Sequence, residues 1–181
     1  MPAYFLLLAA VLSRVIPHAP WFNFTAVGGA LLYFGARRPL REMLAPLAAL
    51  MATDVFLTLF SYHYGFRWQF YVLTWTWYAA AMVLGRILLS GRVTLPRFAA
   101  AVILGPTSFF LLSNFSVWLV GTMYPRTGAG LLACYTAALP FHGLENDLLS
   151  TTLVVGLAFG VPVLLRRLRA EKHAIPAGAA R

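Results

Sequence analysis

The sequence predicts an all-α integral membrane protein with six membrane-spanning helices, and three observations support this class. Hydrophobic residues make up 61% of the 181 residues and charged residues only 10%, too few to cover the surface of a soluble domain. The mean hydropathy of +0.77 arises from long apolar runs separated by short polar gaps. Basic residues gather in every second gap, an alternation that is typical of a multi-pass membrane protein.

The first three apolar runs cover residues 3–16, 24–36 and 43–60. A helix needs about 20 apolar residues to cross the hydrocarbon layer. The first run ends before a proline-rich turn, and the second is so short that it needs neighbouring helices or local thinning of the bilayer. Gly28 and Gly29 in the second run allow another helix to approach closely.

The remaining spans are expected at residues 68–89, 97–121 and 146–165. The last span begins with acidic residues and ends with arginines, which complement the dipole of its helix. Between the fifth and sixth spans lies a shorter apolar run, residues 131–139, with a proline on each side. This run is too short to span, so we expect a re-entrant or interfacial segment before the last helix.

The basic residues predict the orientation of the chain. Short cytoplasmic loops accumulate lysine and arginine, so both termini are expected in the cytoplasm and three loops outside. The net charge of +9 then reflects topology and the anionic headgroups of the bilayer, and no nucleic-acid partner is expected. Residues 1–169 should form one domain, and residues 170–181 a disordered cytoplasmic tail. Most of the 14 basic residues lie in three gaps, at positions 37, 38 and 41, at 86, 92 and 97, and at 166, 167, 169, 172 and 181.

Asp54 is the one acidic residue that lies away from the ends of the expected spans. An ionisable group in hydrocarbon is costly unless it is paired or faces a polar cavity, so Asp54 is a candidate functional residue. Asn114 on the fifth span lies at a similar depth, about 12 Å below the outer surface at 1.5 Å per residue. We expect the two side chains to meet, either as part of a solute site or as a hydrogen bond that locks the bundle.

The fourth span carries an aromatic stripe. Trp68, Tyr71, Trp75 and Tyr78 follow one another at helical spacing, so their rings lie on one face. The first ring belongs at the membrane interface, whereas the deeper rings favour a ligand wall or tight helix packing. Trp118 shares a helix face with the candidate asparagine of the fifth span and joins the candidate site.

The expected exterior loops supply further candidates. Asn23 is either a ligand-binding residue or the N-cap of the second span, and His63 is a hydrogen-bond donor, a metal ligand or a solvated loop residue. Tyr124 and Tyr135 lie in or near the last loop. Cys134 is the only cysteine and is either a soft-metal ligand or a small hydrophobic residue. We expect no resident metal and no cofactor.

Several sequence runs resemble a group of bacterial six-span membrane proteins of uncharacterised function. Those proteins look like the substrate-binding S components of energy-coupling-factor (ECF) vitamin transporters, and the similarity extends over about residues 5–165. The runs that carry it are residues 23–29, Asp54, and residues 84–86, 113–118, 124–127 and 130–135.

The resemblance implies a non-enzymatic, S-component-like bundle in the bacterial cytoplasmic membrane. Such a protein captures a vitamin or related micronutrient at the exterior side. It also implies a partner, an energy-coupling transmembrane subunit with its ATPases. Small residues at four-residue spacing on the first span commonly contact that subunit, and Ala9 and Ser13 offer this spacing here.

Two other classes of function stay open at this stage. One is a membrane enzyme that acts on a lipid or isoprenoid, with His63, His142, Glu145 and Asp147 as its acid and base groups. The other is a structural subunit that binds no small ligand.

Overall fold

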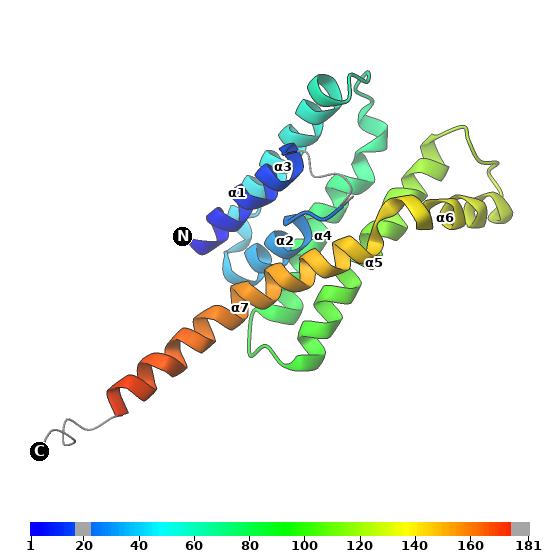
Figure 1. The fold of residues 1–181 in the computed structure, drawn as a ribbon. Coiled ribbons are helices and arrows are strands. Elements are labelled where there is room, and N and C mark those ends of the chain that lie inside the picture. The colour runs from blue at the N-terminus through cyan, green and yellow to red at the C-terminus, as the bar shows by residue number, and fades with distance from the viewer. Residues whose placement is uncertain (17–22, 175–181) are drawn as a thin grey trace, which may run out of the picture.

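The computed structural model describes residues 1–16 and 23–174, which form seven α-helices and no strand (Figure 1). The short helices η1 (Leu40–Glu42) and η2 (Leu57–Ser61, a π-helical turn) extend α3 at its two ends, and η3 (Trp68–Phe70) precedes α4. The α-helices are α1 (Pro2–Val15), α2 (Val27–Arg37), α3 (Leu44–Phe56), α4 (Val72–Leu89), α5 (Leu95–Val120), α6 (Gly128–His142) and α7 (Leu144–Ala174).

Four segments are long and apolar enough to cross a membrane: Leu40–Ser61, Trp68–Leu89, Leu95–Val120 and Leu144–Ala170. They correspond to the third, fourth, fifth and sixth expected spans, so the all-helical fold is confirmed, and four helices able to cross a membrane support a multi-pass membrane protein. The first two expected spans form α1 and α2, of only 14 and 11 residues. A helix of 11 residues is about 16 Å long, roughly half the hydrocarbon thickness.

The short helix α2 lies at the centre of the bundle. Every residue from Val27 to Ala36 is buried, and α2 packs against α1, α4, α5 and α7 (Figure 1). A helix that is apolar on all sides is stable only when other elements surround it. Neighbouring helices therefore shield α2, as the sequence indicates for so short a run.

Glycines permit the closest contacts of α2. A Cβ atom at Gly35 would overlap the backbone carbonyl of Met82 on α4, and a Cβ atom at Gly85 would overlap that of Leu32 on α2. The two backbones therefore touch at both glycines. A Cβ atom at Gly29 would lie 2.5 Å from a side-chain carbon of α7, so the expected close approach at this glycine pair is confirmed.

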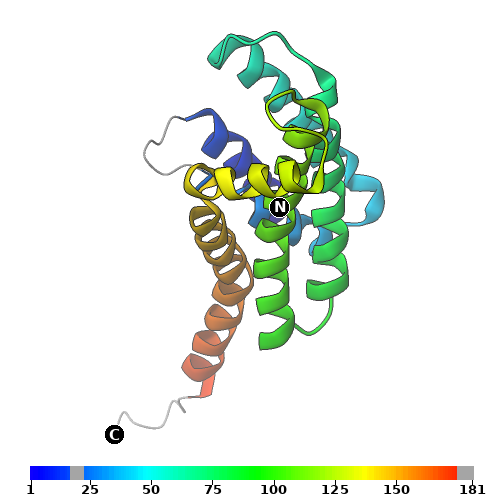
Figure 2. The same ribbon diagram turned by 90° about the vertical axis from the view of Figure 1, so that its right-hand side faces the viewer.

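The apolar run before the last helix forms α6, which lies across the end of α5 (Figure 2). Thr127 caps its start by accepting a hydrogen bond from the Gly130 N–H at 3.1 Å. The expectation that Pro140 bounds this segment is wrong, because the helix continues through the proline and ends at Gly143, whose φ is 63°. A left-handed glycine, not the proline, terminates α6.

The C-terminal part of the last helix, α7, extends beyond the other helices (Figures 1 and 2). Its first half packs against α2 and α5, whereas the residues from Val161 to Ala170 are exposed. The helix continues to Ala174, into the segment expected to be a tail.

Candidate functional site

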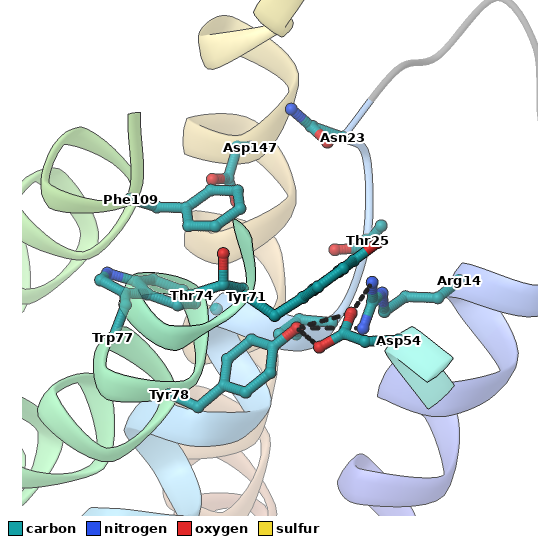
Figure 3. A pocket seen from close by; sticks show the side chains of 12 residues that line it. Arg14, Asn23, Thr25, Asp54, Tyr71, Thr74, Trp77, Tyr78, Phe109 and Asp147 are labelled. Atoms are coloured by element: carbon teal, nitrogen blue, oxygen red, sulfur yellow. Dashed lines mark hydrogen bonds and ion pairs between the residues drawn. The ribbon is translucent and has the colours of Figure 1, made fainter. Parts of the chain in front are cut away.

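A cavity of about 240 Å³ lies where α1, α2, α3, α4, α5 and α7 meet (Figure 3). Small-molecule sites typically measure roughly 300–1,000 Å³, so this cavity suits a small solute. Its wall combines charged, polar and aromatic side chains. The lining residues are Arg14, Asn23, Thr25, Val27, Gly28, Asp54, Tyr71, Thr74, Trp77, Tyr78, Phe109 and Asp147.

Asp54 is held by three side chains. Arg14 Nη2 lies 2.6 Å from Asp54 Oδ1, Trp75 Nε1 donates to Oδ2 at 3.0 Å, and the Tyr78 hydroxyl donates to Oδ2 at 3.1 Å. Arg14 Nη1 also donates to the Tyr78 hydroxyl at 3.0 Å. The carboxylate is only 2% exposed. Its charge and both oxygens are satisfied within the protein, which is the condition under which an acid is tolerated in a membrane.

The expected contact between Asp54 and Asn114 is wrong. The Asn114 amide donates to the Phe110 carbonyl of its own helix at 2.8 Å, and Cys134 of α6 contacts the Asn114 carbonyl at 3.4 Å. Asn114 therefore lies at the α5–α6 contact, whereas Phe109 is the residue of α5 that lines the cavity. The sequence predicts a similar depth for the two residues, but depth does not determine the direction in which Asn114 points around the axis of α5.

The aromatic stripe of α4 separates into different roles. Tyr71 and Tyr78 line the cavity, whereas Trp75 donates to Asp54 and is not a lining residue. Trp68 is 58% exposed at the start of the span. Trp77, outside the stripe, is the buried indole of the cavity wall and packs against Phe109 with tilted rings whose centroids lie 4.7 Å apart.

The ring of Tyr71 is fixed by the π-helical turn. Thr58 donates to the Asp54 carbonyl at 2.7 Å, so its oxygen accepts the hydrogen bond from the Tyr71 hydroxyl. Phe66 stacks on the other side, with ring centroids 5.2 Å apart. The turn that follows Asp54 therefore positions both the acid and one wall of the cavity.

Asp147 is the second acid of the cavity and differs from Asp54. It lies in the first turn of α7 and borders the cavity (Figure 3). Asp147 is 5% exposed, and its carboxylate accepts a hydrogen bond from Thr151 Oγ1 at 3.4 Å. Among the described residues it has no cationic partner. A Cβ atom at Gly28 would lie 2.5 Å from Thr151 Oγ1 and 3.7 Å from Asp147 Oδ1, so the glycine makes room for this pair.

Sequence reasoning missed Arg14 and misread Asp147. Arg14 lies near the end of the first expected span and was not among the candidate residues, but its side chain turns inward and is 20% exposed. The signal was available, because a lone arginine and a lone aspartate in two spans predict an ion pair. Asp147 was interpreted as a complement to the helix dipole or as an acid of a membrane enzyme and not as a residue of the solute site, although Thr151 at i+4 places two polar groups on one buried face.

The other predicted residues divide between the cavity and its surroundings. Asn23 lines the cavity with a φ of 56°, a left-handed conformation that asparagine tolerates better than most residues. His63 lies in an exposed loop and does not line it. Trp118, Tyr124 and Tyr135 also lie outside the lining. Trp118 Nε1 donates to the Pro125 carbonyl at 2.9 Å, and the Tyr135 hydroxyl to the Leu111 carbonyl at 3.0 Å.

The described residues contain no cluster of three or more histidine, cysteine, aspartate or glutamate side chains that could hold a metal ion. Cys134, one of the two candidate metal ligands, is 2% exposed and contacts a backbone carbonyl. Its environment is that of a small buried side chain.

The fold and the cavity define a class: an all-helical protein with four segments long and apolar enough to cross a membrane and with a buried ionic cavity. The chain belongs to the family of unknown function DUF6580, whose family model matches residues 1–174. No curated protein and no solved structure matches it.

Proposed function

We propose that this protein is a membrane-embedded, solute-binding subunit of a micronutrient importer, similar to the S components of ECF transporters. The observation that carries the proposal is the buried carboxylate of Asp147, which borders a cavity without a cationic partner in the described part of the chain. Burying an unpaired acid is costly, and a bound solute that supplies hydrogen-bond donors or a positive charge removes that cost.

The cavity wall indicates the chemistry of the solute. Trp77 and Phe109 offer aromatic surfaces, and Tyr71 and Thr74 add polar groups nearby. Aromatic faces attract both flat rings and cations, and a carboxylate accepts from N–H donors. The proposed solute is therefore small, flat or cationic, and carries an N–H group toward Asp147.

The two acids have different tasks in this proposal. Asp54 is occupied by Arg14, Trp75 and Tyr78, so it holds α1, α3 and α4 together around the cavity. Asp147 contacts the solute. The proposal therefore gives Asp54 the structural role and Asp147 the binding role.

The proposed orientation places the cavity toward the exterior of the bacterial cytoplasmic membrane, with six crossings and both termini inside. It is supported by the two ends of α2, since Gly28 at one end borders the cavity and Arg37 at the other lies among basic residues. Cytoplasmic ends are the basic ones.

An energy-coupling subunit belongs to the proposal through the sequence resemblance. Of the two small residues expected to contact this subunit, Ala9 and Ser13, only the first is free to do so. Ser13 Oγ accepts a hydrogen bond from the Ala26 N–H at 3.0 Å and donates to the Ala10 carbonyl at 2.9 Å, so its hydroxyl is bonded within the helical bundle. Ala9 is exposed.

Native mass spectrometry of the protein purified in mild detergent tests the proposal. Three chains are compared: the unaltered protein, Asp147→Asn, and the control Glu145→Gln, which removes an exposed acid of the same helix turn. A small molecule should co-purify with the unaltered protein and the control and be lost from Asp147→Asn. Equal retention by all three would contradict the site. Release of a chemically altered lipid would favour the membrane-enzyme alternative.

A further inference from the structure

Two adjoining hollows lie around the second half of α7, away from the cavity that contains Asp147. The first, of about 570 Å³, is bordered by three arginines: Arg37 at the end of α2, Arg92 in the α4–α5 loop and Arg166 on α7. No acidic side chain is among the residues described at its wall. Three convergent guanidinium groups without an acid favour an anionic occupant.

The arginine at the end of α2 is held in place. The guanidinium of Arg37 stacks over the ring of Phe159 at 4.6 Å and donates to the Ser90 carbonyl at 3.5 Å. These neutral contacts orient the cation without neutralising it. Its charge therefore remains available to a ligand in the hollow.

The adjoining hollow, of about 470 Å³, runs between α5 and α7 and is mainly apolar. Phe98 and Leu164 are on its wall, and Gly156 and Gly160 keep it open, since a Cβ atom at Gly160 would meet no atom within 4 Å. The two hollows share Val93, Phe159 and Val163, so one molecule can occupy both. It would need an anionic head and an apolar tail.

We propose that this paired site binds one anionic phospholipid, with its phosphate among the three arginines and an acyl chain between α5 and α7. The placement fits a bilayer, because Arg37 ends α2, Arg92 lies in the loop between two spanning segments and Arg166 lies near the end of a third, where headgroups are found. The apolar hollow lies beside a spanning segment. The site does not depend on the solute cavity, which lies at the opposite end of α2.

Native mass spectrometry with added lipid tests this site in the detergent-solubilised full chain. Phosphatidylglycerol should bind more tightly than phosphatidylcholine, and the triple variant Arg37→Gln, Arg92→Gln, Arg166→Gln should weaken it by about tenfold or more. A charge-matched control alters Arg41, Arg86 and Arg126, none of which borders either hollow. The control should retain binding.

A second variant tests the acyl chain without changing charge or the arginines. Gly160→Leu fills open space, so it should fold normally and still weaken phosphatidylglycerol binding severalfold. Inorganic phosphate in excess should displace little lipid. The proposal is overturned if phosphatidylcholine binds as tightly as phosphatidylglycerol, or if both variants bind phosphatidylglycerol like the control. It is also overturned if inorganic phosphate displaces the lipid fully. The last result would assign the arginines to a soluble anion.

Discussion

Substituting Asp54 by asparagine should destabilise the protein strongly. The change removes the negative charge from the ion pair with Arg14 and leaves a guanidinium that is only 20% exposed without its counter-charge. Breaking a buried ion pair costs about 3–5 kcal/mol, and partial exposure of the arginine favours the lower end, about 3 kcal/mol. That corresponds to a factor of roughly 100 in the unfolding equilibrium.

The assay is reversible unfolding in mixed micelles with increasing sodium dodecyl sulfate, followed by far-ultraviolet circular dichroism. Arg14→Gln and the double variant complete a cycle, whose coupling energy should exceed about 1 kcal/mol because the two groups share one network. The control is Glu42→Gln, which alters a partly exposed acid that pairs with Arg38 and accepts a hydrogen bond from Tyr4. If Asp54→Asn costs no more than this control, the reasoning about the buried network is refuted.

Four further predictions concern packing and the cavity. Asp147→Asn should leave the midpoint of the same unfolding curve unchanged or raise it, because a buried acid without a cationic partner disappears; a large loss would show that the acid is structural. Gly35→Ala should cost about 3 kcal/mol or more by overlap with the α4 backbone, whereas Gly160→Ala should be harmless, and similar stabilities for the two would contradict the close α2–α4 contact. Trp75→Phe keeps an aromatic ring but loses the N–H that reaches Asp54, so it should cost about 1.5–3 kcal/mol, with an unchanged midpoint as the opposing result. Thr58→Val should cost about 1 kcal/mol and increase the mobility of the Tyr71 ring in NMR spectra; a ring as rigid as before would remove the π-helical turn from the site.

The sequence predicted the helical elements well where length and hydropathy decide them. The fourth expected span coincides with the segment Trp68–Leu89, and the glycine pair of the second span makes the close contact expected of it. Both features are local. Apolar length identifies a span, and a missing side chain permits close packing, whichever helices surround it.

The cavity was predicted only in part, because rotation about a helix axis cannot be read from one sequence. Depth along the span placed Asp54 and Asn114 at one level, but the structure turns Asn114 toward α6 and Phe109 toward the cavity. Arg14 and Asp147 lie near the ends of expected helices, so their side chains were not expected in the cavity. Their inward direction is set by contacts between helices that are distant in sequence.

The central claim is that the cavity containing Asp147 takes up solute from outside the cell. Cysteine labelling tests it most directly, since Cys134→Ala removes the only cysteine and Thr74→Cys then places one thiol in the cavity wall. Arg92→Cys marks the opposite end as a control. A membrane-impermeant maleimide added to intact cells should label the Thr74→Cys protein and not the Arg92→Cys protein. The reverse pattern, with Thr74→Cys labelled only in inverted vesicles, would contradict the account.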